Sequence, residues 1–157
     1  MVRRLTHAPL EIAALIEETG DGGSGALVVF VGTVRDVSDG RAVAAITYTA
    51  HDALCEKVLA DLEANILHRF PVRRCLIRHR LGRLAVGEAS VLIVVRSAHR
   101  EVAWEASRAA IDELKLRAPI WKEEHLVGGG SRRVPGVPLV TKGGSGERDA
   151  PPKDPFR

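Results

Sequence analysis

The sequence predicts a single globular domain that mixes helices with strands, and three observations lead to that prediction. A chain of 157 residues, 45% of them hydrophobic, can bury a core that is stable without disulfides or bound metal ions. Segments with apolar residues at helical spacing alternate along the chain with runs rich in β-branched residues. Internal repeats are absent from the sequence. We therefore expect one domain over 1–134 and a Gly/Pro-rich, flexible tail over 135–157.

The first elements are a helix and two strands. An amphipathic pattern from Pro9 to Thr19 predicts the helix. The continuous apolar run Ala26 to Arg35 predicts a central strand buried on both faces, with Arg35 at the open end of the sheet. The segment Asp36 to Arg41 contains an Asp-Gly turn signal, and Ala42 to Ala50 alternates as a strand. We expect the two strands to form a hairpin.

The middle of the chain predicts a helix followed by a basic strand. Apolar spacing from His51 to Phe70 indicates an amphipathic helix that ends before Pro71. The segment Arg73 to Leu84 alternates, with arginines on one side, which favours a solvated sheet face over an anion site. His79 falls on the apolar side, which favours a hydrogen-bonded core histidine over a catalyst.

A strand from Ser90 to Arg96 leads directly into the next helix, for which Ser97 is a plausible N-cap. His99 and Arg100 then occupy the first helical turn, where free N–H groups and the helix dipole attract anions. Positive side chains destabilise a helix at its N-terminus, so the presence of two of them there indicates a functional role. Arg100 offers a planar fork to a phosphate. For His99 the alternative is an ordinary surface residue.

The stretch Ile111 to Glu124 carries the two lysines on which the functional prediction depends. A helical wheel puts Lys115 beside the apolar face, with Trp104 close to that face. Pro119 ends the helix, so Lys122 lies on an extended segment. Two amines that face one pocket can act as acid or base and stabilise charge. The alternative is that Lys115 snorkels along an apolar rim and Lys122 is a solvated edge charge.

Composition narrows the classes of partner and substrate. A net charge of +3 and a pI of about 9.2 suit an anionic small substrate or an acidic partner. Aromatic residues make up only 4% of the chain, which disfavours nucleic-acid binding. Cys55 and Cys75 form no CxxC pair and are expected to be buried packing residues. We expect no metal, no other cofactor and no membrane span, and hence a cytoplasmic protein.

Four motifs, in this order, resemble the large, catalytic subunit of molybdopterin synthase, the MoaE family. They are FVGTVRD (30–36), HRLGRLAVGE (79–88), SAHR (97–100) and DELKLRAPIWKEE (112–124). Each motif is weak alone, but the ordered set is specific and spans Ala8 to Val134. The resemblance implies an α+β fold: a MoaE-like catalytic domain over 1–134 whose mixed or antiparallel sheet and flanking helices make a hammerhead-like arrangement.

The resemblance also implies an activity and its partners. The family transfers sulfur to cyclic pyranopterin monophosphate and so makes molybdopterin for molybdenum cofactor biosynthesis. The sulfur arrives on a small ubiquitin-like subunit whose C-terminal Gly-Gly carries a thiocarboxylate. Two large and two small chains form a heterotetramer, which contains a homodimer of large subunits. The sulfur donor is therefore expected to be external, and neither cysteine of this chain has to react.

The family's site residues carry over by position in this sequence. The two lysines that the resemblance marks as essential are Lys115 and Lys122. The positions expected to contact substrate are Thr33, Val34, Arg35, His99, Arg100, Lys115, Lys122, Glu123 and Glu124.

This chain departs from the family at two places. Arg133 stands where the family usually has tryptophan before Val134, and the Gly/Pro-rich tail is not part of the family pattern. Besides the sulfurtransferase, two alternatives remain open: a non-catalytic binding module for a ubiquitin-like partner, and an anion or nucleic-acid binder that uses the arginine face. The pair Lys115 and Lys122 favours the enzyme over the module, because a scaffold has no need of two converging amines.

Overall fold

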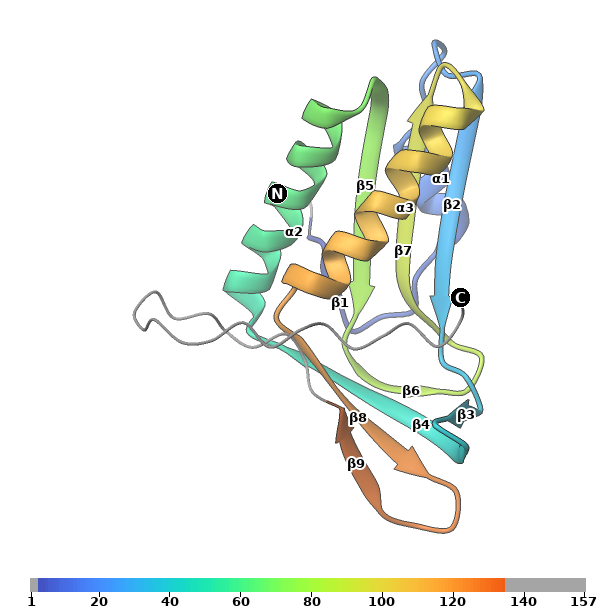
Figure 1. The fold of residues 1–157 in the computed structure, drawn as a ribbon, viewed down its shortest axis with the longest axis vertical. Coiled ribbons are helices and arrows are strands. Elements are labelled where there is room, and N and C mark those ends of the chain that lie inside the picture. Colours follow the sequence, from blue (N-terminus) through green and yellow to red (C-terminus); the bar gives the residue numbers. More distant parts are fainter. Residues whose placement is uncertain (1–2, 135–157) are drawn as a thin grey trace.

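The computed structural model describes residues 3–134, so the predicted tail lies outside the described residues. Figure 1 labels the elements in chain order. The helices are α1 (Ile12–Glu18), α2 (Asp52–Arg69) and α3 (Arg100–Arg117). The strands are β1 (Leu5–Thr6), β2 (Ala26–Thr33), β3 (Val37–Ser38), β4 (Arg41–Ala50), β5 (Val72–Arg80), β6 (Gly82–Ala85), β7 (Ala89–Ser97), β8 (Ile120–Leu126) and β9 (Ser131–Val134). The predicted α+β class is confirmed.

The first sheet has four strands in the order β1-β5-β7-β2. It is mixed, because β7 pairs antiparallel with β5 and β2 while β1 joins β5 in parallel. The prediction that Ala26–Arg35 forms the central strand is wrong: β2 lies at the edge, and of its residues only Val28 is fully buried. The apolar run arises because Val28 and Phe30 pack toward one core cluster while Val29 and Val31 pack toward another.

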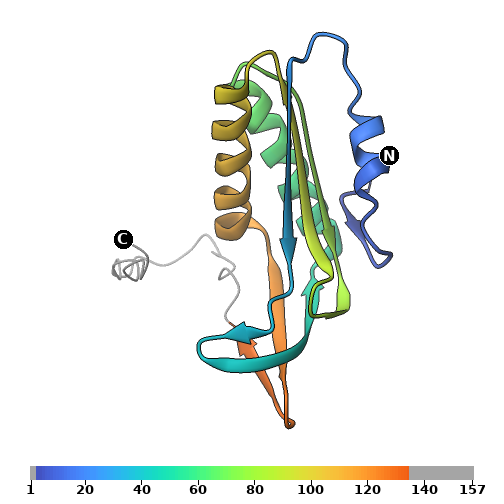
Figure 2. The same cartoon turned by 90° about the vertical axis from the view of Figure 1, so that its right-hand side faces the viewer.

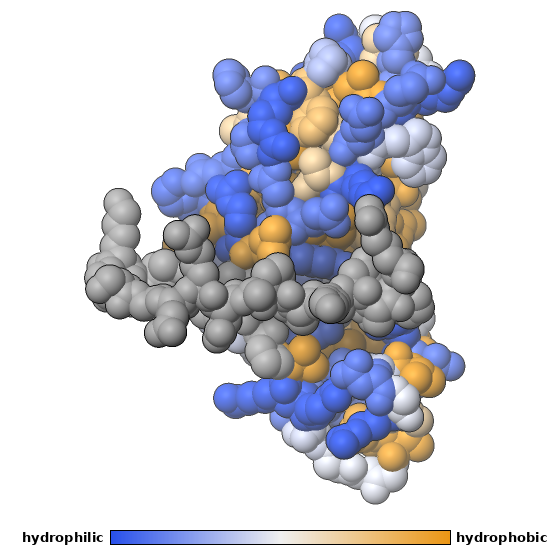
Figure 3. Space-filling view, in the orientation of Figure 1, coloured by the Kyte–Doolittle hydropathy of each residue, from blue (hydrophilic) through white to orange (hydrophobic). Residues whose placement is uncertain are grey.

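Helices cover both faces of this sheet (Figure 2). On one face α2 and α3 bury the main core, in which Leu59 and Ile93 are fully inaccessible to solvent. On the other face α1 places Leu15 against Leu92 and Val94 of β7. The outer surface over α2 and α3 is mainly hydrophilic, with smaller apolar patches (Figure 3). No helix within residues 3–134 has the length and apolarity needed to cross a bilayer.

The second sheet runs β3-β4-β8-β9, with β6 paired to β4. The Asp-Gly turn is confirmed: Asp39 and Gly40 both have positive φ, 48° and 73°, as a two-residue hairpin turn requires. The predicted hairpin partner is wrong, however, because the turn joins β4 to the short strand β3, whereas β2 pairs with β7 in the other sheet. A second turn, Gly128 to Gly130, connects β8 to β9 with positive φ at all three glycines.

Charged side chains are buried between the first sheet and its helices. The prediction of a solvated arginine face is wrong for Arg78, which is 6% exposed because α1 covers that face of β5. Its guanidinium pairs with Glu18 at 3.0 Å and lies 3.7 Å from Glu63. Glu63 also accepts the Ile77 N–H at 2.8 Å and pairs with Arg4. A buried charge persists only when it is paired in this way.

Candidate active site

Lys115 and Lys122 open onto one pocket of about 420 Å³. Lys115 is exposed on the last turn of α3, and Lys122 is partly buried on β8. The chain passes from helix to strand within two residues: the Ala118 N–H bonds to the Leu114 carbonyl, and the Ile120 N–H bonds to the Ala118 carbonyl. The predicted helix end at proline and the extended segment after it are confirmed.

The predicted wheel needs one correction. Trp104 is 64% exposed and does not lie on the buried face of α3. That face is centred on small residues, among them Ala103, Ala106 and Ala110, rather than on Ile111. Because Ile111 marks one border of the buried face, Trp104 falls outside it, while Lys115 stays at the rim of the pocket as predicted.

The floor of the pocket comes from the strands and carries three polar side chains. His79 of β5 is 5% exposed, and burial lowers its pKa to about 4. Its ring meets Tyr48 edge to face with the ring centroids 5.2 Å apart. The Tyr48 hydroxyl is hydrogen-bonded to Ser90, and burial raises the pKa of the phenol. The predicted burial of His79 is confirmed, but its position in the pocket was missed because only the pairing of β4 with β8 and β6 brings these strands together.

The last residue of β2 and the two residues after it differ in their surroundings. Thr33 lines the lysine pocket. Val34 is 2% exposed, and its backbone N–H and carbonyl bond to Glu88 and Gly87, so its side chain belongs to the core. Arg35 is exposed beyond the end of the strand, as predicted.

The two glutamates after Lys122 differ in their surroundings. Glu124 is 1% exposed, and its carboxylate accepts hydrogen bonds from Ser38 at 2.8 Å and from Arg132 at 2.6 Å. Burial opposes ionisation, but these two bonds hold the pKa of Glu124 below its usual range. Glu123 bonds to the Ser131 hydroxyl and lines a second, smaller pocket of about 310 Å³ that also contains Arg133.

His99 and Arg100 lie at the opposite end of α3 from the lysine pocket. Lys115 follows Arg100 by fifteen positions, which at 1.5 Å per residue corresponds to about 22 Å. His99, rather than Ser97, occupies the N-cap position, and the His99 N–H bonds to the Ser97 hydroxyl at 3.4 Å. Arg100 is largely exposed and pairs with Glu101. Within one chain, the predicted cluster of helix N-terminus and lysines does not come together.

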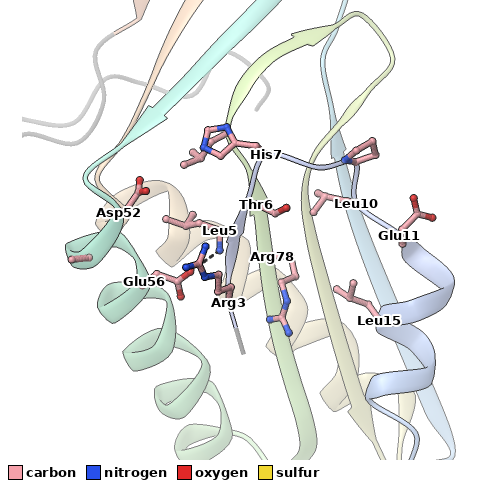
Figure 4. Close-up of a pocket in the computed structure, with 13 residues that line it drawn as sticks. Arg3, Leu5, Thr6, His7, Leu10, Glu11, Leu15, Asp52, Glu56 and Arg78 are labelled. Atoms are coloured by element: carbon pink, nitrogen blue, oxygen red, sulfur yellow. Dashed lines mark hydrogen bonds between the residues drawn. The ribbon is translucent and has the colours of Figure 1, made fainter. Parts of the chain in front are cut away.

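A larger cavity, about 630 Å³, lies elsewhere, among β1, α1 and the start of α2 (Figure 4). It contains neither lysine, and both signs of charge surround it, including Arg3, Glu11 and Asp52. We place the candidate site at the smaller lysine pocket, because chemistry needs convergent reactive groups more than volume.

Both cysteines are buried, as predicted. Burial raises the pKa of the Cys55 and Cys75 thiols to about 12, so neither is a thiolate near neutral pH. Within residues 3–134 no three His, Cys, Asp or Glu side chains are grouped to hold a metal ion.

Comparisons with known proteins agree on one family. A family model described as MoaE protein matches residues 5–117. The molybdopterin synthase catalytic subunit of Nostoc sp. is 41% identical over 131 residues, which cover 83% of this chain and 79% of that protein. The subunit of the same name from Synechococcus elongatus is 43% identical over 145 residues, 92% of this chain and 88% of that one.

Solved structures show the same fold. Molybdopterin synthase from Staphylococcus aureus has a TM-score of 0.80 at 33% identity, over 85% of this chain and 96% of that one. A chain from a complex of subunits 1 and 2 of the molybdopterin-converting factor of Helicobacter pylori has a TM-score of 0.66 over 88% of this chain and 90% of that one. At 24% identity the second match bears on the fold alone.

Proposed function

Because the chain belongs to the MoaE family, we propose that it is the catalytic subunit of a molybdopterin synthase and transfers sulfur to cyclic pyranopterin monophosphate. The observation that carries this proposal is the single pocket onto which Lys115 and Lys122 both open. A binding module without catalysis would not need two amines at one cavity of a size that accepts a small molecule.

The sulfur comes from a small ubiquitin-like subunit with a C-terminal Gly-Gly thiocarboxylate. Its sulfur attacks a carbon of the pterin side chain and displaces an oxygen substituent of that carbon, which leaves in protonated form. Water later cleaves the acyl link to the carrier, which leaves sulfur on the pterin and a carboxylate on the carrier. Two carriers supply the two sulfurs of the dithiolene. Both thiols of this chain are buried and protonated, which fits an external donor. Glycines suit the end of an extended tail that must pass between side chains.

We assign a different chemical role to each of the two lysines. Attack and hydrolysis each need a proton donor for the leaving oxygen and a positive group beside the developing oxyanion. We assign proton transfer to Lys115, on the last turn of α3. Charge stabilisation and substrate anchoring fall to Lys122, which the ladder between β4 and β8 holds in place.

The phosphate is anchored by arginines, and a second copy of the chain completes the site. Arg35 lies just beyond Thr33, which lines the pocket. Arg100 is about 22 Å from Lys115 along its own helix, which is too far to reach the lysine pocket of the same chain. In a twofold dimer it reaches the lysine pocket of the partner protomer. In such a dimer each contact is made twice, so both pockets gain His99 and Arg100 from the other copy.

Reconstitution tests the activity. The purified chain is mixed with a thiocarboxylated small subunit and the pterin precursor, and molybdopterin is measured by mass spectrometry. Lys115→Ala should lose about 10²- to 10⁴-fold in rate. Lys57→Ala is the control, because Lys57 is exposed on α2 and, among the described residues, pairs only with Asp61. Absence of product with the unmodified chain would refute the proposal.

Complementation tests the shared site. Lys115→Ala and Arg100→Ala chains are each expected to be nearly inactive, but a mixed dimer contains one pocket with neither change. Random reassortment makes half of the dimers mixed, which restores about a quarter of the wild-type activity. If the mixture is no more active than the separate variants, each pocket is built from one chain.

A further inference from the structure

One polar side chain of the lysine pocket has no part in the chemistry proposed above. His79 lies in the pocket floor, and its Nδ1 is 2.9 Å from the carbonyl oxygen of Arg80. A carbonyl can only accept a hydrogen bond, so Nδ1 carries the hydrogen. The other ring nitrogen, Nε2, therefore has a free lone pair while the ring is neutral.

That lone pair has no protein partner among residues 3–134. Among side-chain nitrogen and oxygen atoms sealed from solvent in this range, only Arg80 Nε lacks a hydrogen bond. Nε2 of His79 also lacks one, so it is not sealed and opens into the pocket that the ring lines. The polar neighbours are already engaged, because Tyr48 bonds to Ser90 and Ser90 donates to the Gly32 carbonyl.

The pocket thus has two chemically distinct ends. The rim carries the positive lysines, of which Lys115 is exposed, whereas the floor offers a neutral acceptor. The imidazole stays neutral near physiological pH because burial lowers its pKa to about 4. A matching ligand carries an N–H donor at its inner end and negative charge at its outer end. A pterin monophosphate has ring N–H groups and a phosphate.

We propose that Nε2 of His79 accepts a hydrogen bond from a ring N–H of the pterin and thereby orients the heterocycle beneath the lysines, an inference that rests on the proposed function. The other source of an N–H donor is the backbone of the partner's tail. The tail has to reach only the rim, where the lysines serve its terminal carbonyl. The floor is therefore left to the small molecule.

Two substitutions at one position separate orientation from structural support. His79→Asn keeps a donor near the place of Nδ1, where it can bond to the Arg80 carbonyl, but removes the acceptor at Nε2. His79→Gln loses that donor and puts an amide oxygen near the place of Nε2. A purely structural histidine predicts that Gln is the worse replacement, whereas the orienting histidine predicts that Asn is.

The dissociation constant of the pterin is measured by calorimetry for the wild type and both variants, alongside thermal unfolding and the affinity for the small subunit. His79→Asn should weaken pterin binding about tenfold, the effect of one lost hydrogen bond. His79→Gln should stay within about threefold of wild type, and small-subunit affinity should not change for either. The inference is overturned if Asn binds pterin like wild type, if Gln binds it more weakly than Asn, or if small-subunit affinity falls instead. Product formation by the wild type in the same preparation tests the proposed function separately. A wild type that binds no pterin would refute both the inference about His79 and the proposed function.

Discussion

Replacing Glu124 with glutamine should destabilise the second sheet, although this residue was expected from the sequence to contact substrate. Its carboxylate accepts two hydrogen bonds from Arg132, at 2.6 and 3.2 Å, and one from Ser38 at 2.8 Å. Glutamine keeps one acceptor but loses the charge that Arg132 faces. Charge-assisted hydrogen bonds contribute about 1.5–3 kcal/mol each. Arg132 retains its pair with Asp39, so we expect a loss of about 3 kcal/mol.

Thermal unfolding followed by circular dichroism measures this loss. For a domain of this size about 3 kcal/mol corresponds to a Tm lower by about 6–12 °C. Glu123→Gln is the matched control on the same strand, because within residues 3–134 the Glu123 carboxylate bonds only to Ser131, in an exposed contact, and its loss should cost less than about 0.5 kcal/mol. Equal Tm values for the two variants would show that the buried carboxylate does not hold β9 in place.

A comparison of the wild type with Glu124→Gln also tests how stability depends on pH. The pKa of Glu124 is lowered from its ordinary 4.5 in the folded state. A lowered folded pKa adds stability that is complete above the unfolded pKa and is lost as the pH falls through the folded value. The stability difference between wild type and Glu124→Gln should therefore be constant above about pH 5.5 and shrink below 4.5. A difference that grows in acid would reverse the sign of the argument.

Three further predictions concern the pocket, the thiols and the core. Lys122→Arg should retain more activity than Lys122→Ala in single-turnover assays, whereas Lys115→Arg should be inactive because guanidinium does not give up its proton; the opposite pattern would exchange their roles. Cys55 and Cys75 should react with a thiol reagent only after unfolding, and their serine variants should keep sulfur transfer; rapid labelling of the native protein would contradict their burial. Leu59→Ala, at a fully buried position, should cost about 3–5 kcal/mol in urea unfolding, and a loss below 1 kcal/mol would mean that the core closes over the cavity.

The sequence predicted what depends on local pattern. The helix ending before Pro71, the turn at Asp39 and Gly40, and the break between Lys115 and Lys122 all follow from residues close together in the chain. Pairing between distant segments was not accessible. The edge position of β2 and the burial of Arg78 depend on which strand and which helix lie alongside, and an apolar run or an alternating run fits several neighbours.

The sequence also predicted only those features of the candidate site that depend on local pattern. The two lysines were found because they lie seven residues apart around a proline, and the structure brings them to one pocket. His79 was expected to be buried, but its place in the pocket that Lys115 also lines depends on contacts between strands that are far apart in sequence. For Glu124 the family resemblance implied substrate contact, and only the fold shows its bonds to Ser38 and Arg132.

The length of α3 limits how this protein can change during evolution. One helix joins the turn that starts at Arg100 to the lysine at its other end, and each inserted residue would rotate the far end by about 100° and move it by about 1.5 Å. Even a single insertion or deletion within α3 would turn Lys115 away from the pocket. The turn from Gly128 to Gly130 has open space around it, so insertions there are tolerable. Length variation among relatives should therefore accumulate between β8 and β9 and be absent from α3.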